Sequence, residues 1–362
     1  SHVSKAFDGK QDDNTPNFYD IRLFNLSKFI YGANHLTGTS NWGSLASNTT
    51  FDSVKNYSVS LSGGTDADIT TADRTLAWDK FRNPEEVDVQ LLISGAADLE
   101  LVDYIQAIAN ERKDCMAFFS PLQQDAVNSV NMDNIIAYRQ SFSSPSSYGV
   151  MDSGWGYQFD KYNNKYIWVP LNADIAGLCA RTDSIRDPWW SPAGFNRGQI
   201  LNKIKVSWNP NKAQRDELFQ NGINPVLAFP GDGIILFGDK TLQAKSSAFD
   251  AINVRRLFIV LEKAIATAAK YSLFEFNDSF TRQAFINLVT PYLRSIQGKR
   301  GIYDFYVRCD ETNNTPQVID SNGFICDLFI KPSRSIRYIQ LNFIATPTGV
   351  AFSEYQLSLI HI

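Results

Sequence analysis

Residues 87–119 read VDVQLLISGAADLELVDYIQAIANERKDCMAFF and contain two apolar runs separated by a helical pattern. The run at 87–93 predicts a strand, and residues 99–112 predict a helix because apolar side chains recur there at every third or fourth position. Residues 115–119 form a short, wholly apolar run that predicts a second strand. A strand, a helix and a strand at this spacing form a βαβ unit. We therefore expect the two strands to be parallel and their sheet to be covered on both faces.

The chain before residue 209 carries further helical and alternating patterns around this unit. Helices are predicted at about 70–81, 133–140 and 174–181, and strands at 151–152, 157–159 and 166–169. Thr70 or Thr71 can cap the first helix, and Asn163-Asn164 predicts a hairpin turn. We expect residues 57–208 to form a mixed α/β domain, and we interpret the polar residues 1–56 as the remnant of a preceding domain or as a linker.

The second half of the chain predicts a different arrangement. Helices are expected at about 212–221, 254–271 and 279–296, a hairpin at 226–237, and alternating strands at 303–309, 324–330 and 339–345. Asn253 is the expected N-cap of the helix at 254–271, which is predicted to be the longest of the chain. The predicted fold class is therefore α/β plus α+β. A mixed α/β domain is followed, over residues 209–349, by an α+β domain with a long helix and a three-stranded antiparallel meander.

The composition argues against several classes of protein. The formal net charge of the 362-residue chain is −4, which disfavours a general nucleic-acid binder. No apolar stretch approaches the roughly 20 residues that a membrane helix needs, so we expect no membrane insertion. The three histidines, His2, His35 and His361, lie in no motif that predicts an active site. The cysteines form no C-x-x-C pair, and we expect buried free thiols at Cys115, Cys179, Cys309 and Cys326.

Two loops have some features of ligand-binding motifs. Residues 231–238 contain three glycines, but they precede a strand rather than a helix, so a hairpin turn is predicted instead of a dinucleotide loop. Residues 310–316 combine acidic and Asn side chains, yet they lack the glycine and the distal glutamate of a calcium loop. We predict a turn there, in which Asn and Thr side chains bond the backbone. We predict no catalytic, cofactor-binding or metal-binding residues. A hydrolase centred on Ser94, Ser120 and Asp174 is the enzymatic alternative.

Three cations of the predicted helix at 254–271 lie off its apolar stripe, namely Arg255, Arg256 and Lys263. Two arginines at a helix start oppose the helix dipole, which predicts that a carboxylate partner holds them there. They can belong to an anion site or to ion pairs between subunits. We treat all three as candidate interface charges.

A series of short motifs carries a resemblance over about residues 57–355. In order, the motifs are LSGG (61–64), VDVQL (87–91), DC (114–115), WVPLNADIAGLCARTD (168–183), SPAGFNRG (191–198), GINPV (222–226), GDGIILFGDKT (231–241), INVRRLF (252–258), CDETNNTP (309–316) and RSI (334–336). Each motif alone is weak, but so many in one order are specific. The chain resembles the tail sheath proteins of contractile-tailed bacteriophages of the T-even type, with an N-terminal truncation.

The resemblance implies a structural subunit without enzymatic activity or cofactors. Such a subunit polymerises helically around the tail tube and contracts to drive the tube through the host envelope. The implied partners are neighbouring sheath subunits, the tail tube protein, and the baseplate and tail terminator proteins, with assembly in the bacterial cytoplasm into the virion tail. Another polymerising tube protein or a secretion-system sheath is the alternative within this class.

The resemblance also implies extended terminal arms that add strands to the sheets of neighbouring subunits, which is β-augmentation. In this chain the C-terminal arm would span residues 350–356, with Val350, Phe352 and Tyr355 as its apolar contacts. We interpret residues 357–362, which do not fit the preceding pattern, as a non-native tail.

Overall fold

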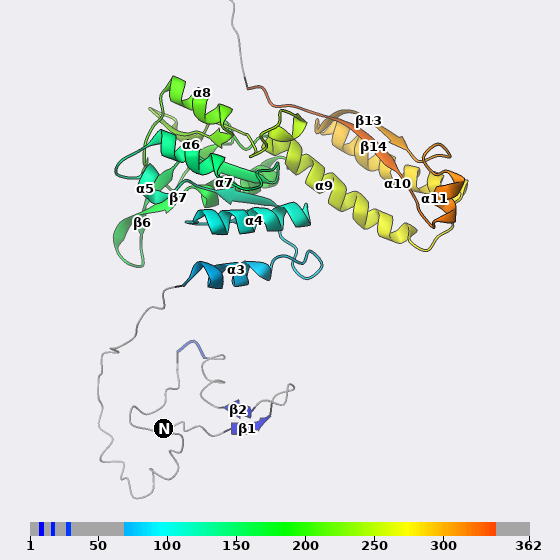
Figure 1. Cartoon of the computed structure of the whole chain (residues 1–362), viewed down its shortest axis with the longest axis horizontal. Coiled ribbons are helices and arrows are strands. Elements are labelled where there is room, and N and C mark those ends of the chain that lie inside the picture. Colours follow the sequence, from blue (N-terminus) through cyan, green and yellow to red (C-terminus); the bar gives the residue numbers. More distant parts are fainter. Residues whose placement is uncertain (1–6, 11–15, 19–26, 30–68, 338–362) are drawn as a thin grey trace, which may run out of the picture. The chain divides into compact units, whose positions relative to one another are not determined.

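The computed structural model describes residues 7–10, 16–18, 27–29 and 69–337 (Figure 1). The chain divides into two units, residues 1–68 and residues 69–362. In the first unit, β1 (Phe7–Lys10) pairs antiparallel with β2 (Pro16–Phe18). The strand expected at 57–61 and the one expected at 339–345 lie outside the described residues, as does the proposed arm at 350–356.

A four-stranded parallel sheet forms the centre of the second unit. Its order is β10 (Ile223–Asn224), β5 (Gly149–Asp152), β4 (Met116–Phe119) and β3 (Leu91–Ile93). The β3–β4 pair is parallel and is joined by α4 (Leu99–Arg112), so the predicted βαβ unit is confirmed. β3 is shorter than the strand predicted at 87–93, because only residues 91–93 pair with a neighbouring strand.

Both faces of this sheet are covered. Ala117 and Phe119 of β4 pack in one core with α4, and Met116 and Phe118 pack in another core with α7 (Asn172–Ile185). Successive strand residues point to opposite faces, so the wholly apolar sequence of β4 follows from its position between two helical layers. Three further helices precede α7: α3 (Thr71–Asp79), α5 (Gln123–Ala126) and α6 (Met132–Gln140). Thr70 caps α3 with a capping box, as predicted.

Two smaller antiparallel sheets adjoin the parallel one. The first has the order β7 (Lys165–Pro170), β6 (Trp155–Asp160), β9 (Lys205–Val206). The second has the order β11 (Val226–Phe229), β12 (Gly233–Leu236), β8 (Gln199–Ile200). Asn164 adopts a positive φ of 49° in the predicted hairpin turn between β6 and β7.

These pairings cross the boundary that we expected between residues 208 and 209. β10 joins the parallel sheet beside β5, and β12 pairs with β8. Residues 209–242, including α8 (Lys212–Gln220), therefore pack with the segment that precedes them. A helix and a hairpin following Asn209-Pro210 resembled the start of a new domain, but their strands complete earlier sheets.

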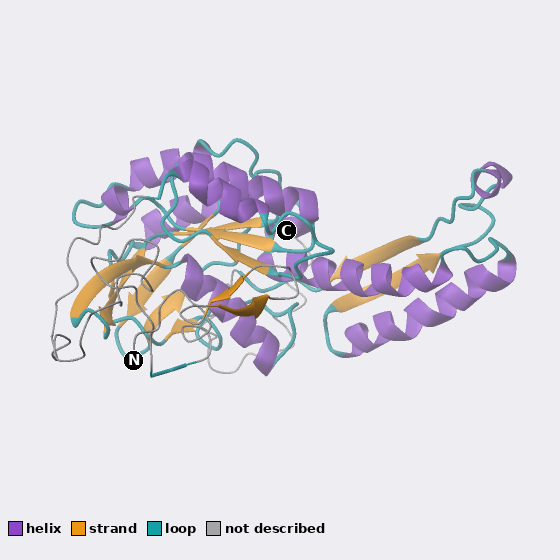
Figure 2. Ribbon diagram, turned by 90° about the horizontal axis from the view of Figure 1, so that it is seen from below, coloured by secondary structure: helices purple, strands orange, loops and turns teal. Residues whose placement is uncertain are grey.

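Two long helices and a hairpin sheet form the C-terminal part (Figure 2). After η2 (Ala248–Asp250) come α9 (Ile252–Ala269), η3 (Lys270–Ser272), α10 (Ser279–Gly298), β13 (Ile302–Arg308), α11 (Pro316–Asp320) and β14 (Asp327–Pro332). Leu257 and Leu261 of α9 pack against Val289 and Leu293 of α10, with Trp189 at one end of this core. The α+β prediction holds for the described strands, β13 and β14, which pair antiparallel.

Two details of this part differ from the prediction. Among the described helices the longest is α10, with 20 residues, and not α9, with 18. Asn253 does not cap α9: the helix begins after Ala251, and the Asn253 side chain donates to the backbone carbonyl of Trp189 at 3.2 Å. A buried carbonyl without a partner is costly, and the Asn253 Nδ2 group supplies the donor for this one. Among the described helices, none combines the length and apolar character that a bilayer crossing requires.

Candidate functional site

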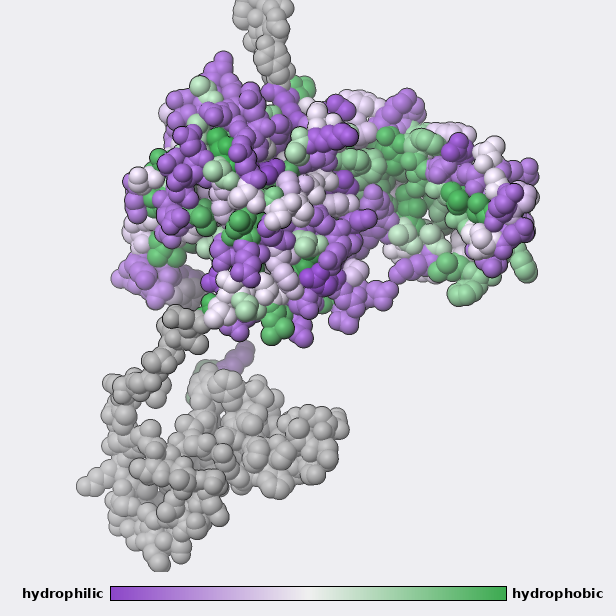
Figure 3. Space-filling model, in the orientation of Figure 1, coloured by the Kyte–Doolittle hydropathy of each residue, from purple (hydrophilic) through white to green (hydrophobic). Residues whose placement is uncertain are grey.

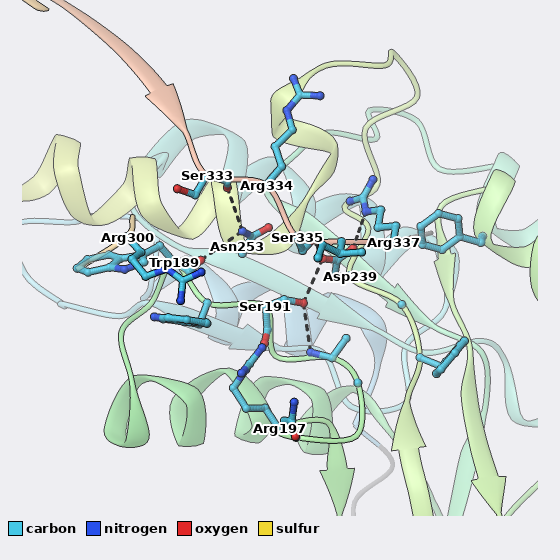
Figure 4. A pocket seen from close by; sticks show the side chains of 18 of the residues that line it. Trp189, Ser191, Arg197, Asp239, Asn253, Arg300, Ser333, Arg334, Ser335 and Arg337 are labelled. Carbon is cyan, nitrogen blue, oxygen red and sulfur yellow. Dashed lines mark hydrogen bonds and ion pairs between the residues drawn. The ribbon is translucent and has the colours of Figure 1, made fainter. Parts of the chain in front are cut away.

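Asp239 joins three of the sequence motifs at the junction between the central sheets and the C-terminal helices. Its carboxylate accepts hydrogen bonds from Ser191 Oγ at 3.1 Å and from Ser335 Oγ, and Arg337 Nε donates to Oδ1 at 2.8 Å (Figure 4). Asp239 is only 4% exposed, so this charge is neutralised inside the protein. The motifs SPAGFNRG, GDGIILFGDKT and RSI thus form one joint that holds the segment after β14.

Asn224, in the GINPV motif, makes a second joint. Its Oδ1 accepts from the Lys240 N–H at 2.7 Å, and its Nδ2 donates to the carbonyls of Met151 at 3.0 Å and of Lys240 at 2.8 Å. The backbone at Gly198 packs closely against the backbone at Gly194. A Cβ atom on residue 198 would lie only 2.8 Å from Gly194 N. These motifs therefore encode contacts between backbone segments of the chain. Glycine is needed where two segments approach too closely to leave room for a Cβ atom.

The CDETNNTP loop also serves a structural role. Asn314 is 1% exposed; its Nδ2 donates to the Ile325 carbonyl at 2.8 Å, and its Oδ1 accepts from the Ile325 N–H at 2.9 Å. Asn313 Nδ2 donates to the Arg308 carbonyl at 2.8 Å. The predicted turn with side-chain-to-backbone bonds is what the structure contains. No group of three His, Cys, Asp or Glu side chains suited to a metal occurs within the described ranges.

The candidate interface charges Arg255 and Arg256 lie in the interior of the chain. Arg256 is 4% exposed and donates to both carboxylate oxygens of Asp183 on α7, at 2.8 Å and 2.5 Å. Asp183 is the carboxylate partner that the sequence predicted for this helix start. Lys263 lies nearer the surface and pairs with Asp88. The structure thus gives Arg256 and Lys263 partners within the chain, and an intersubunit role for these charges stays a prediction.

Arg255 has no carboxylate partner among the described residues. Its guanidinium carbon lies 4.0 Å from the centre of the Phe249 ring and 4.3 Å from that of Tyr148, whose hydroxyl oxygen lies 3.2 Å from Nη1. Cation–π contacts with the two rings offset part of the cost of burying this charge. Burial nevertheless lowers the pKa of Arg255 below its ordinary value.

The residues of the hydrolase alternative lie near the carboxyl edge of the parallel sheet, where α/β enzymes place their active sites. Ser94 follows β3 and Ser120 follows β4. Ser120 Oγ lies 2.6 Å from Asp152 Oδ2, and the Asn172 N–H donates to Ser120 Oγ at 2.9 Å. Asn172 Nδ2 in turn donates to Ser94 Oγ at 3.0 Å. The structure therefore brings the two serines into one network.

The three residues of the hydrolase alternative do not form a nucleophile with its base. Asp174 does not contact either serine and pairs with Lys203 Nζ at 2.9 Å. Ser120 and Asp152 are 4% and 1% exposed, so both lie in the interior. We predicted Asp152 only as a strand residue. Its position at the carboxyl end of a parallel strand was the signal that could have placed it in this cluster.

Asp152→Asn is expected to remove part of the pH dependence of stability. Burial raises the pKa of the Asp152 carboxyl from 3.8 to about 8, so the folded protein retains a proton that the unfolded chain releases. The free energy of unfolding should then fall as the pH rises from about 4 to about 8, by up to about 1.4 kcal/mol per pH unit. Urea unfolding across this range should show a shallower decline for the Asn variant. Equal slopes would contradict a buried neutral carboxyl.

The cysteines are free thiols in the described residues, and Cys115, Cys179 and Cys309 are buried whereas Cys326 is half-buried. Burial raises the pKa of the Cys115 thiol to about 12 and that of Cys179 to about 11. A thiol with so high a pKa is a poor nucleophile at neutral pH. These side chains therefore act as small apolar core residues.

A cavity of about 930 Å³ lies beside the Asp239 joint. It is lined by the loop at 189–197, by α8, by the end of β12 and by residues 333–337 (Figure 4). Trp190, Phe219 and Phe237 contribute aromatic surface, and the cations around them include Arg197 and Arg300. Sequence reasoning did not predict this cavity, because its walls come from segments that lie far apart in the sequence.

The chain is similar to proteins of known role over most of its length. Residues 67–242 match the family model of the phage tail sheath protein central domain, and residues 244–346 match that of the phage tail sheath C-terminal domain. The tail sheath protein of Enterobacteria phage T4 is 46% identical over 316 residues, which cover 82% of this chain and 48% of that protein. The tail sheath protein of Vibrio phage KVP40 is 45% identical and covers 81% and 47%. The chain spans about half the length of these curated relatives.

Solved structures share the fold. The helical sheath of the anti-feeding prophage in its contracted state has a TM-score of 0.63 at 20% identity, over 78% of this chain and 76% of that chain. The sheath complex of the extracellular contractile injection system PVC, also contracted, has a TM-score of 0.63 at 20% identity, over 72% of each chain.

Proposed function

Because the chain belongs to the phage tail sheath protein family, we propose that it is a structural subunit of a contractile tail sheath. The observation that carries this proposal is the match to the central and C-terminal sheath domains in the family's order over residues 67–346. The two matches meet at residues 242 and 244, which agrees with the sheets that cross residue 208. We therefore propose a domain boundary near residue 243.

In this proposal, subunits polymerise helically around a tail tube and repack on contraction, and the stored energy lies in their interfaces. A heterologous contact repeated by a screw operation produces an open tube instead of a closed ring. The subunit then needs no nucleotide site and no catalytic group, which fits the buried network at Ser120. The proposed partners are neighbouring subunits, the tail tube, the baseplate and the tail terminator, in a virion assembled in the bacterial cytoplasm.

The β13–β14 sheet supports an assembly role. Within the described part of the chain these strands pair only with each other, and α10 packs along β13. Each outer edge carries backbone N–H and C=O groups that can accept a strand from another chain. We propose that the C-terminal arm, with Val350, Phe352 and Tyr355, adds such a strand to a neighbouring subunit.

Exposed apolar side chains also favour large contacts with other proteins. Figure 3 shows hydrophobic residues in green over the part formed by α9, α10 and the β13–β14 sheet. Five large apolar residues near the connection between α9 and α10 are 63% or more exposed: Tyr271, Leu273, Phe274, Phe276 and Phe280. A concentration of exposed apolar surface of this kind is typical of interaction sites.

Deletion of residues 350–362 is expected to abolish polymers while leaving the fold intact. The arm would supply a backbone-bonded joint between subunits, and it lies beyond the match to the C-terminal sheath domain, which ends at residue 346. Negative-stain electron microscopy of the purified protein measures polymer formation, and thermal unfolding measures the fold. Deletion of residues 357–362 alone is the matched control and should preserve polymers.

The same micrographs test the proposed function itself. Tubes or striated helical polymers formed by the undeleted protein support a sheath subunit. A stable monomer with hydrolytic turnover would instead favour the enzyme alternative. Polymers that persist without the arm would contradict its role as the joint, but they would leave the sheath proposal standing.

A further inference from the structure

Three arginines surround Trp190, which lines the cavity beside Asp239. The guanidinium carbons of Arg186, Arg197 and Arg300 lie 5.7, 5.2 and 5.5 Å from the centre of the Trp190 ring. We call Trp190 and these three arginines the Trp190 cluster. None of the three arginines makes an ion pair with a carboxylate anywhere in the described ranges, although Arg197 Nε donates to the Ser191 carbonyl at 2.7 Å.

The charges of the cluster repel one another. The pKa of Arg197 is lowered by burial and, in addition, by the positive charge of Arg186. A partner that brought carboxylates to this site would relieve the repulsion as well as form new charge-assisted hydrogen bonds. The cluster is therefore better suited to a bound anionic group than to exposure to water alone.

The cavity extends this positive surface. Six cationic side chains and two carboxylates line it. One carboxylate, Asp239, is already used by Arg337, Ser191 and Ser335. Arg334 on the rim has no hydrogen bond or ion pair among the described residues, and Figure 4 shows its side chain directed away from Asp239. With Trp190, Phe219 and Phe237 in the wall, the cavity fits a peptide that carries both carboxylates and apolar side chains.

This chain itself carries a segment of that chemistry. The loop at 83–88 reads NPEEVD, and its Glu85 and Glu86 are exposed with no ion pair among the described residues. Pro84 and Val87 flank the two carboxylates and supply apolar surface. The acidic loop and the basic cavity are complementary in charge, and a screw-related contact brings two different surfaces of one chain type together.

The loop that fills the cavity must come from another copy. Asp88 at the end of the loop is held by Lys263 on α9, whereas Asn253 on α9 lines the cavity. Neither Glu85 nor Glu86 lines the cavity of its own chain. Arg112 Nη2 donates to the Val87 carbonyl at 2.9 Å and holds the loop in its place.

We propose that the cavity beside Asp239 binds loop 83–88 of a second copy of this chain, with Glu85 and Glu86 facing Arg300 and Arg334. This inference rests on the proposed helical assembly and assigns one of its contacts. The contact is electrostatic and partly exposed, so it should weaken as the salt concentration rises.

A charge exchange in the undeleted protein tests the contact. Arg300→Glu with Arg334→Glu is expected to raise the protein concentration needed for polymers at least tenfold, and Glu85→Arg with Glu86→Arg should do the same. Combining all four substitutions should restore most of the polymer, because the charges are then complementary again. Lys161→Glu with Lys165→Glu, on the exposed β6–β7 hairpin, is the matched control and should leave assembly unchanged.

Two results would overturn the proposal. The first is that either pair of reversals leaves the polymers intact. The second is that the four-fold exchange does not restore polymers although each variant unfolds at the wild-type temperature. In the first case the wild-type polymers would still support the sheath function. If a charge-reversed variant unfolds early, Arg300→Gln with Arg334→Gln replaces it.

A binding measurement separates this contact from polymerisation. A peptide of residues 81–90 should change the tryptophan fluorescence of the monomeric protein saturably, and the Arg300→Gln, Arg334→Gln variant should not respond. A peptide with Glu85→Gln and Glu86→Gln is the negative control. If the peptide binds only after residues 338–362 are removed, the chain's own C-terminal residues fill the cavity. That result would contradict the proposal that a second copy supplies the bound loop. Absence of polymers with intact peptide binding would count against the sheath proposal alone.

Discussion

Arg256→Ala is expected to lower the free energy of unfolding by about 3 kcal/mol, at the lower end of the range for breaking a buried ion pair. The side chain of Arg256 is 5% exposed and that of its partner Asp183 is 28% exposed, so water can replace only part of the lost interaction. The substitution also removes the donor at 3.3 Å from the Cys179 carbonyl. Urea or thermal unfolding of the purified protein measures the change.

The matched variants identify the source of this effect. Asp183→Asn keeps an acceptor for one guanidinium hydrogen bond and should cost less, about 1–2 kcal/mol. The double variant should be more stable than the sum of the two single effects predicts, because neither buried charge is then left alone. A loss below about 1 kcal/mol for Arg256→Ala would show that the pair contributes no more than a surface ion pair.

Asp239→Ala is expected to lower the free energy of unfolding by about 2–4 kcal/mol and to release residues 333–337. It removes the shared acceptor of Ser191, Ser335 and Arg337 at a position that is 4% exposed. Donors left without a partner at a buried site cost about 1–3 kcal/mol each, and Arg337 retains Asp250 as a second partner. Hydrogen exchange of residues 333–337 should become faster than that of α10.

Asp232→Ala is the matched control, since Asp232 lies exposed in the turn of the same motif. This change should alter stability by less than about 0.5 kcal/mol, as is usual for surface positions. Unchanged hydrogen exchange at residues 333–337 in Asp239→Ala would contradict the role of this carboxylate as the anchor of the segment after β14.

The local elements of the fold could be predicted because their signals lie within a few residues of one another. The helical periodicity of residues 99–112 and the apolar run before Ser120 predicted α4 and β4, and Thr70 predicted the cap of α3. Longer-range pairings had no such signal. The pairing of β12 with β8 gave no local pattern, so a sheet that crosses the boundary expected after residue 208 was not predicted. Asn253 was assigned to a cap because the Trp189 carbonyl that takes its amide lies 64 residues away.

The sequence by itself determined the family, through the order of its motifs, and most of the helices and strands, through their periodicity. The tertiary structure alone decided what the charged residues do. It buried Arg255 against two aromatic rings, paired Arg256 with Asp183, placed Asp152 in a buried network, and brought Arg300 to Trp190, Arg186 and Arg197 in the segment that follows α7. The physical reason is the separation along the chain of the residues on which each property depends. Periodicity depends on neighbours along the chain, whereas the cost of burying a charge depends on groups that only folding brings within hydrogen-bond distance.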